Sequence, residues 1–420
     1  MRFLYTAALF LLLPYIALRL LWRARKQPEY LHHIGERFGF YHPRSNLPVI
    51  WLHAVSVGET RAAQNLVARL QTTYPGHQIL LTHTTPTGRA TGEQLFGDSV
   101  QRVYLPYDYP FAVRRFLRHF RPQIGILMET EIWFNLIHAC RASATPLVLL
   151  NARMSEKSAR GYARFATLTG TALQKLAAIA AQTADDAARL ASLGAENVSV
   201  MGNLKFDIAA PPTLLELGQQ LRRQFGTARK IFLVASTRDG EEVQLLDALA
   251  EMQIPDLLVV IVPRHPQRFD AVADLLEQRG LAFQRRSADY AVAPEIQVVL
   301  GDSMGEMFAY YAAADIAFIG GSLQPYGGQN LIEACAVGTP VLIGPHTWNF
   351  AEATRLAVAT GAAEQMPDAG ELVVKLESLL KDPSAMAAMR KQCIAFVQAN
   401  RGATDNAMRV IRAVYDARPG

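Results

Sequence analysis

Residues 47–70 read LPVIWLHAVSVGETRAAQNLVARL: an apolar run, a turn of small residues and an amphipathic helical pattern. The run from Leu47 to Leu52 is continuously apolar, which is typical of a strand buried on both faces of a parallel sheet. The turn leads directly into the helix, whose first N–H groups attract anions. Here the turn carries its own acid, Glu59. We therefore predict a strand–turn–helix unit of an α/β fold whose corner holds a carboxylate.

The same strand-then-helix unit recurs along most of the chain. In the first half, the further apolar runs are ILLTHTT, VQRVYLP, QIGILME, PLVLLNAR, AIAAQT and NVSVMGN. After the adjacent prolines Pro211 and Pro212, which mark a linker, the runs are KIFLVAS, DLLVVIVP, LAFQRRS, IQVVLGD, DIAFIGGS and TPVLIGP. From about residue 366 the pattern is helical to the end. Two doubly wound α/β domains are predicted, at 29–210 and 211–420, with ligands bound in the cleft between them.

Composition limits the class of protein. A chain of 420 residues exceeds the size that one core fills, which agrees with two domains. The net charge of +5 favours an acidic ligand or a membrane surface, but it is too small for a nucleic-acid-binding protein. Cys140, Cys335 and Cys393 are widely separated in apolar surroundings, so we expect buried thiols in a reducing compartment.

The N-terminal segment predicts a membrane anchor over residues 1–28. No charge occurs between Phe3 and Leu18, and a basic cluster follows: Arg19, Arg23, Arg25 and Lys26. Sixteen uncharged residues form about 24 Å of helix, against a hydrocarbon core of about 30 Å. The segment could span with Arg19 reaching the surface, or lie in the interface with Trp22 as an anchor. A signal peptide and a buried core helix stay open as alternatives. The basic cluster places the remainder at the cytoplasmic face.

The stretch IGGSLQPYGGQNLIEACAVGTPVLIGP, residues 319–345, is rich in glycine around a predicted strand end and helix start. Paired glycines permit positive φ and let a phosphate approach free N–H groups. Asn330 and Glu333 could instead form a capping box that serves only the helix. A carboxylate one turn into such a helix is also placed to accept hydrogen bonds from ribose hydroxyls.

Two further strand ends carry candidate ligand contacts. In VVIVPRHPQRF, residues 259–269, Arg264 follows Pro263 at the strand end, where a guanidinium can clamp a phosphate or carboxylate. In LGDSMGEMF, residues 300–308, Asp302 or Ser303 is predicted to cap a helix that starts near Met304. The N–H groups of this start, at Met304, Gly305 and Glu306, could then meet a base or phosphate.

The first domain carries acids at its strand ends instead: Glu59, then Glu129 and Glu131 in METEIW, with Lys205 in GNLKFD. Any one acid could simply complement a helix N-terminus. The convergence of several at the C-terminal ends of one sheet predicts a site. A carboxylate held by helix N–H groups should have a lowered pKa, so we expect such a group, Glu59 included, to stay ionised and to act as a base or a charge stabiliser, not as an acid.

Several enzyme signatures are missing from the sequence. It contains no G-x-G-x-x-G followed by an acid about 20 residues later, no G-x-x-x-x-G-K-[ST], no G-x-S-x-G and no cluster with metal-ligand spacing. Dehydrogenase, P-loop kinase, serine hydrolase and zinc-enzyme functions therefore lack support.

The apolar N-terminus and the motifs HAVSVGE, METEIW, GNLKFD, VPRHPQRF, GDSMGE and GGSLQPYGGQNLIEA occur in this order along nearly the whole chain. In this the chain resembles the 3-deoxy-D-manno-octulosonic acid (Kdo) transferases of Gram-negative lipopolysaccharide synthesis. The resemblance implies a GT-B glycosyltransferase with two Rossmann-like domains. It further implies CMP-Kdo as donor, the lipid A precursor lipid IVA as acceptor, an inner-membrane location and no metal or other cofactor.

The resemblance also implies roles for individual residues. Glu59 matches the general base, and Glu129 and Lys205 match residues assigned to transition-state stabilisation. The CMP-binding stretches correspond to Pro263 and Arg264, to Met304, Gly305 and Glu306, and to Asn330, Leu331, Ile332 and Glu333. The family commonly has His before the Asn of the last motif, where this chain has Gln329, which puts one ligand contact in doubt.

Two other functions are compatible with these patterns. One is another membrane-associated GT-B transferase that uses a UDP-sugar donor. The other is a membrane-tethered nucleotide-binding module without catalysis. Activity with CMP-Kdo against UDP-sugars distinguishes the first, and substitution of Glu59 distinguishes the second.

Overall fold

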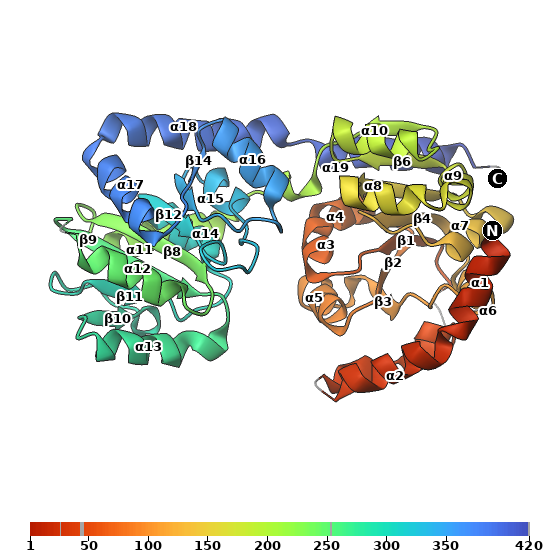
Figure 1. The fold of residues 1–420 in the computed structure, drawn as a ribbon, viewed down its shortest axis with the longest axis horizontal. Helices are drawn as coiled ribbons and strands as arrows, with labels where there is room; N and C mark the ends of the chain where they lie inside the picture. Colours follow the sequence, from red (N-terminus) through yellow and green to blue (C-terminus); the bar gives the residue numbers. More distant parts are fainter. Residues whose placement is uncertain (26, 43–45, 253, 419–420) are drawn as a thin grey trace. The chain divides into compact units, whose positions relative to one another are not determined.

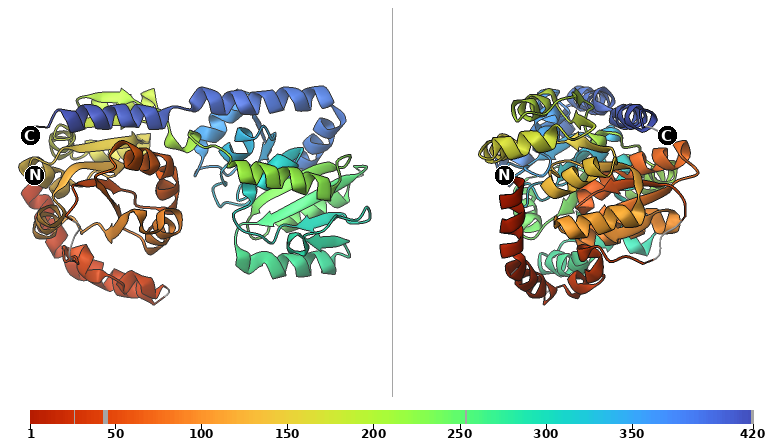
Figure 2. Two further views of the ribbon diagram at one scale, coloured as in Figure 1. Left: turned by 180° about the vertical axis from the view of Figure 1, so that it is seen from behind. Right: turned by 90° about the vertical axis from the view of Figure 1, so that its right-hand side faces the viewer.

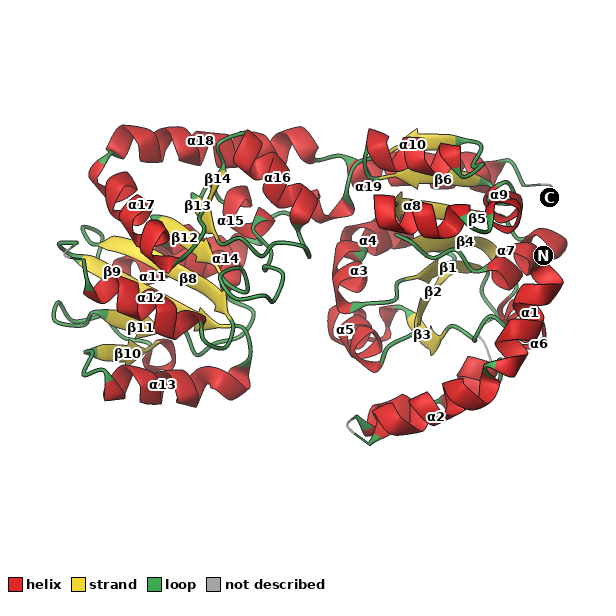
Figure 3. Ribbon diagram, viewed as in Figure 1, coloured by secondary structure: helices red, strands yellow, loops and turns green. Residues whose placement is uncertain are grey.

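The computed structural model describes residues 1–25, 27–42, 46–252 and 254–418. Its contacts divide the chain into two compact units, one built from residues 1–207 and the C-terminal residues from Arg401 onward, the other from residues 208–400 (Figure 1). Each unit contains one seven-stranded parallel sheet with helices around it (Figure 3). The prediction of two doubly wound α/β domains is confirmed.

The sheet of the first unit has the strand order β3-β2-β1-β4-β5-β6-β7. Its strands are β1 (Val49–His53), β2 (Gln78–His83), β3 (Gln101–Tyr104), β4 (Pro122–Met128), β5 (Leu147–Ala152), β6 (Ala178–Ala181) and β7 (Val198–Val200). The order reverses direction between β1 and β4, where His53 pairs with Leu127. In open α/β sheets, ligands bind beyond the C-terminal strand ends at such a reversal.

Both faces of this sheet are covered, as the continuous apolar runs predict. Trp51 packs into one buried cluster together with Phe116 of α6, and its neighbour Ile50 packs into the opposite cluster together with Leu66 of α4. The helices of this unit are α1 (Arg2–Leu11), α2 (Leu13–Ala24), α3 (Val57–Ala62), α4 (Gln64–Thr73), α5 (Pro86–Phe96), α6 (Pro110–Phe120), α7 (Phe134–Ala142), α8 (Glu156–Ala163), α9 (Ala166–Leu173), α10 (Ala184–Ser192) and α19 (Ala403–Asp416).

The sheet of the second unit has the order β10-β11-β9-β8-β12-β13-β14, with its reversal between β8 and β12. Its strands are β8 (Lys230–Thr237), β9 (Leu257–Pro263), β10 (Phe283–Arg285), β11 (Val298–Leu300), β12 (Ile316–Ile319), β13 (Val341–Ile343) and β14 (Ala363–Gln365). Its helices are α11 (Pro212–Phe225), α12 (Glu241–Ala250), α13 (Phe269–Gln278), α14 (Met307–Ala313), α15 (Ile332–Ala336), α16 (Ala351–Ala359), α17 (Ala369–Lys381) and α18 (Pro383–Asn400).

Short 3₁₀ helices connect several of these elements. They are η1 (Pro28–Leu31), η2 (Ile34–Phe38), η3 (Gly97–Ser99), η4 (Leu204–Phe206), η5 (Pro266–Arg268) and η6 (Arg286–Ala288).

The C-terminal helix α19 differs from the sequence-based boundary, which assigned all of 211–420 to the second domain. It packs on α4 and on β5 and β6 of the first unit (Figure 2). Ile411 lies fully buried in that unit's core, and Asp207 accepts hydrogen bonds from the backbone N–H groups of Gly402 and Thr404. The sequence pattern of a helix indicates which of its faces is apolar, but it does not indicate against which sheet that face packs.

The N-terminal segment forms two helices, α1 and α2, that meet at an angle of 50°. Pro14 lies in the first turn of α2, and a proline inside a helical run removes one backbone hydrogen bond and bends the helix. Among the described residues, no single helix is long and apolar enough to cross a membrane, although the bent pair passes by length and composition. Lys26, part of the predicted basic cluster, lies outside the described residues.

α1 is attached to the first unit by polar contacts. The Tyr5 hydroxyl donates to Asp108 Oδ2 at 2.9 Å, and the Tyr109 hydroxyl donates to the Leu9 carbonyl at 2.8 Å. The apolar side chains on its other face are exposed, with Phe3 at 82% and Leu11 at 84%. α1 is therefore held to the domain on one side and presents a hydrophobic surface on the other.

Candidate active site

Glu59 lies at the predicted corner, in the first turn of α3 directly after β1. Ser56 caps this helix and accepts a 3.3 Å hydrogen bond from the Glu59 N–H. In return the Glu59 carboxylate accepts hydrogen bonds from the Val55 N–H and the Ser56 hydroxyl, both at 2.8 Å. This reciprocal arrangement is a variant of the capping box, and it fixes both carboxylate oxygens.

The pKa of Glu59 is raised to about 7, not lowered as the sequence predicted. Burial is the largest cause, and the nearby carboxylates of Glu129 and Glu131 raise the pKa further. The hydrogen bonds from Val55 and Ser56 act in the opposite direction and are outweighed. The expectation was wrong because it considered the hydrogen bonds that stabilise the ionised carboxylate but not the hydration that this carboxylate loses on burial. A carboxylate with a pKa near 7 is better matched to general-base catalysis than one near 4.

Two more acids follow β4, the neighbouring strand. Glu129 adopts φ 58°, a left-handed conformation that turns the chain sharply at the strand end. Glu131 accepts a hydrogen bond from the Trp133 indole N–H. One Glu131 oxygen lies 3.9 Å from His53 Nε2, while burial lowers the pKa of His53 to about 3 and keeps its ring neutral. Burial has the opposite effect on an acid, and it raises the pKa of Glu131.

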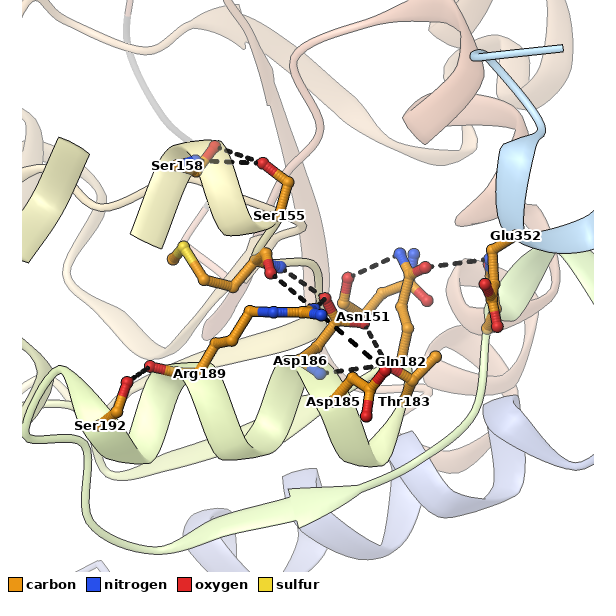
Figure 4. Close-up of polar contacts among 12 residues, drawn as sticks. Asn151, Ser155, Ser158, Gln182, Thr183, Asp185, Asp186, Arg189, Ser192 and Glu352 are labelled. Carbon is orange, nitrogen blue, oxygen red and sulfur yellow. Dashed lines mark hydrogen bonds and ion pairs between the residues drawn. The ribbon is translucent and has the colours of Figure 1, made fainter. Parts of the chain in front are cut away.

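Lys205 approaches this group from η4, after the last strand, with its Nζ 3.8 Å from Glu129 Oε1. A chain of amides fixes the loop that carries it, and this chain begins at Asn151 and Gln182 (Figure 4). The Gln182 amide donates to the Asn151 carbonyl at 3.0 Å and accepts from Asn203 Nδ2 at 3.1 Å. Asn203 Oδ1 in turn accepts from the Lys205 N–H at 3.0 Å. The structure thus brings Glu59, Glu129 and Lys205 to one edge of one sheet.

In the second unit, the glycine-rich corner is occupied by the protein itself. Glu241, fully buried in the first turn of α12, accepts hydrogen bonds from the N–H groups of Gly321, Ser322 and Leu323 at 2.6, 2.9 and 3.0 Å. The Arg238 N–H donates to the same carboxylate at 2.8 Å. The N–H of Gly321 is thus used by the protein itself, and the carboxylate of Glu241 joins the residues that follow β12 to the start of α12.

Cationic side chains gather at the adjoining strand ends. Arg264 follows β9, and its Nε donates to Gln329 Oε1 at 3.2 Å. Arg238 Nη1 lies 2.9 Å from His265 Nε2. Burial and the charges of Arg238, Arg264 and Arg268 lower the pKa of His265. This concentration of positive charge suits a phosphate group, and Gln329, the departure from the family pattern, orients Arg264.

The stretch 330–333 has the internal bonds of a cap. Asn330 Oδ1 accepts from the Ile332 N–H, and Asn330 Nδ2 donates to Glu333 Oε1, both at 3.0 Å. The helix α15 begins at Ile332, close to the helix start predicted near Asn330. Leu331 and Ile332 are fully buried, so only their backbone could face a ligand. These bonds are local to the helix start, but Leu331 is the N-cap residue and Glu333 accepts from the side chain of Asn330, so the capping box considered as an alternative is not formed.

The stretch 302–306 also differs from expectation. The helix α14 begins at Met307, and Asp302 does not cap it. Asp302 instead accepts hydrogen bonds from the N–H and hydroxyl of Ser287, at 2.8 and 2.7 Å. Met304 is 56% exposed, Gly305 has φ 82°, and Glu306 accepts from Ser303 at 2.7 Å.

Comparison with known proteins identifies the family. A family model described as 3-deoxy-D-manno-octulosonic-acid transferase (kdotransferase) matches residues 32–208, and one described as glycosyl transferases group 1 matches residues 228–396. The chain is 45% identical over 418 residues to a 3-deoxy-D-manno-octulosonic acid transferase of Bordetella pertussis, covering 96% of this chain and 97% of the relative. The chain belongs to the Kdo transferase family.

Further relatives agree. A Kdo transferase of Haemophilus influenzae is 38% identical over 418 residues, covering 98% of both chains. Among solved structures, Anabaena Alr3699/HepE in complex with UDP is 15% identical with a TM-score of 0.58, covering 88% of this chain and all of that chain. The latter similarity concerns the fold alone. This Kdo transferase is a glycosyltransferase with the GT-B architecture.

Sequence reasoning missed four residues that contribute to the site of this Kdo transferase. Ser56 and Val55 hold the carboxylate of Glu59, and the S-x-x-E spacing of a capping box was the available signal. Glu241 organises the glycine-rich corner from 80 residues away, a distance at which no local pattern helps. Arg238 follows β8 as Arg264 follows β9, so the same strand-end rule would have found it.

Proposed function

We propose that this Kdo transferase moves Kdo from CMP-Kdo to lipid IVA, with Glu59 as the general base. The observation that carries the proposal is the raised pKa of Glu59, about 7, on a carboxylate whose two oxygens are held at 2.8 Å by Val55 and Ser56. Such a group accepts a proton from a hydroxyl near neutral pH, which is what the acceptor sugar must give up.

In the proposed step, the acceptor hydroxyl oxygen forms a bond to the anomeric carbon of Kdo. The bond between that carbon and the phosphate oxygen of CMP breaks, and its electron pair leaves with CMP. Glu59 takes the hydroxyl proton. Glu129 and Lys205, 3.8 Å apart beside it, stabilise the charge that develops during transfer.

The donor nucleotide is assigned to the second unit. Its phosphate is matched by the cationic strand ends around Arg264 and Arg238, and its ribose by the stretch Asn330 to Glu333. Metal-independent transfer is part of the proposal, because the leaving phosphate can be neutralised by these guanidinium groups. Met304, Gly305 and Glu306 are proposed to contact the cytosine side of the nucleotide.

Work at the cytoplasmic face of the inner membrane is also proposed. It is supported by the exposed apolar residues of α1 and α2, among them Leu18 at 66% and Trp22 at 59%. An acceptor with acyl chains is reached most directly by an enzyme that rests on the same surface.

The experiment is transfer in vitro with purified full-length protein, radiolabelled lipid IVA and CMP-Kdo regenerated in situ. Products carrying one or more Kdo residues are expected, and they resolve the number added. Turnover with UDP-sugars and not with CMP-Kdo would refute the donor assignment. Retention of activity in Glu59→Gln, with unchanged folding, would refute the proposed base.

A further inference from the structure

A cavity of about 1100 Å³ lies in the first unit along α1, α6 and α7. Pockets that bind small ligands have volumes of roughly 300–1,000 Å³, so this one has room for a lipid head group. Arg121, which precedes β4, and Pro122, its first residue, line the cavity. Glu129 follows the same strand at its opposite end. The cavity is therefore distinct from the group of Glu59, Glu129 and Lys205.

The lining of this cavity is cationic. Five arginines line it, and none of its lining residues is acidic: Arg2, Arg114, Arg118, Arg121 and Arg418. Within the described ranges none of the five forms an ion pair with a carboxylate. His138 also lines the cavity, and burial together with the charge of Arg2 lowers its pKa. An anion in the cavity would relieve this repulsion among like charges.

The surface beside the cavity is apolar. Phe3 of α1 lines the cavity itself and is 82% exposed. On its other side, α1 borders a second cavity of about 640 Å³, lined by apolar side chains that include Leu4, Phe134 and Phe165. Cationic and apolar surfaces thus meet along one short helix, which is the pattern of groups that bind an anionic head group and its acyl chains at an interface.

We propose that the arginine-lined cavity binds the phosphate of an anionic glycerophospholipid and so docks the first unit on the membrane. The inference rests on the proposed membrane association, and it adds a lipid site separate from the acceptor site. A phospholipid of the bulk membrane is favoured over the acceptor's own phosphates because none of Glu59, Glu129 and Lys205 lines the cavity.

The test compares full-length wild type with the triple variant Arg2→Gln, Arg114→Gln and Arg118→Gln. Flotation is measured with vesicles of phosphatidylcholine alone or with 30% phosphatidylglycerol, a mixture of about one anionic lipid in three that gives a strong surface charge. The matched control, Arg160→Gln, Arg409→Gln and Arg412→Gln, removes three exposed charges of the same unit that lie outside the cavity. We expect the cavity variant to lose at least about tenfold in partitioning onto anionic vesicles, and the control at most about threefold.

Each other result has a definite meaning. Equal losses in the two triple variants, or no loss in either, would overturn the cavity as a site. A wild type that fails to bind any vesicle would refute the membrane association on which the inference rests, while transfer activity in detergent tests the chemistry separately. A raised KM for lipid IVA in neutral detergent micelles would assign the cavity to the acceptor instead. Displacement of the protein from anionic vesicles by millimolar glycerol phosphate alone would indicate a site for free phosphate and would also overturn the proposal of a phospholipid site.

Discussion

The Ser56 hydroxyl donates a 2.8 Å hydrogen bond to the Glu59 carboxylate and accepts one from the Glu59 N–H. This pair is one of several influences on the protonation of the proposed base, of which burial is the largest. Because the bond favours the ionised carboxylate, it lowers a pKa that burial raises to about 7. The activity of this Kdo transferase should therefore depend on pH in a way that Ser56 controls.

A base must be ionised, so kcat/KM is expected to fall about tenfold per pH unit below pH 7. Ser56→Ala removes a hydrogen bond that lowers the pKa of Glu59, so the acidic limb of the pH profile, where kcat/KM falls, should move to higher pH. Glu131→Gln removes a neighbouring negative charge and should move the limb to lower pH. The measurement is kcat/KM for transfer between pH 5 and 9.

Ser155→Ala is the matched control for this profile, because Ser155 caps α8 through the Ser158 N–H without touching an acid (Figure 4). Its profile should overlay the wild type. Shifts of the same sign in Ser56→Ala and Glu131→Gln would contradict the assignment of the limb to Glu59.

Glu59→Gln should abolish transfer and stabilise the protein at high pH. Since the pKa of Glu59 rises to about 7 on folding, its ionisation costs stability as pH increases from the unfolded value near 4.3 through 7. The gain at pH 8 should be on the order of 2 kcal/mol in the first unit, and it should vanish at pH 4. Thermal unfolding at both pH values measures it.

Glu93→Gln removes an exposed carboxylate of the same unit and serves as the control, with no pH-dependent gain. If Glu59→Gln is destabilised equally at pH 4 and pH 8, the burial argument fails and hydrogen bonding dominates at this position.

Much of the fold could be predicted because each core strand coincides with an apolar run in the sequence. The exception is β14, whose residues Ala363, Glu364 and Gln365 contain no such run; it lies at the edge of the sheet, and only Ala363 is buried. The return of α19 to the first unit and the carboxylate of Glu241 beneath Gly321 depend on contacts between distant segments. The pKa of Glu59 depends on burial, which local sequence does not report.

Glu241→Ala should destabilise the second unit by about 3–5 kcal/mol, because it leaves several buried N–H groups without an acceptor. Because residues 320–324 should then lose their conformation, nucleotide binding should be lost as well. Glu251→Ala, at the exposed end of the same helix, is the control and should change stability by less than about 0.5 kcal/mol. Unfolding in urea and CMP titration give the two readouts. A stable Glu241→Ala protein that binds CMP normally would show that the carboxylate is dispensable.

Arg264 and Gln329 should act as one unit in nucleotide binding. A charge-assisted hydrogen bond contributes about 1.5–3 kcal/mol, so Arg264→Ala should raise the Kd for CMP by roughly 10- to 150-fold. Gln329→Ala leaves the guanidinium in place but removes the 3.2 Å bond that orients it, and a smaller increase of about three- to tenfold is expected. Titration calorimetry measures both.

The double variant Arg264→Ala, Gln329→Ala tests whether Gln329 contributes to nucleotide binding by orienting Arg264. If Gln329 acts only through Arg264, its substitution should cost nothing once Arg264 is gone, and the two effects should be non-additive by about 1 kcal/mol. Gln329→His retains a ring nitrogen that can accept from Arg264 Nε, so it should bind CMP within about threefold of wild type. Arg223→Ala, an exposed arginine of α11, controls for loss of charge alone. Full additivity would mean that Gln329 contacts the nucleotide independently of its bond to Arg264.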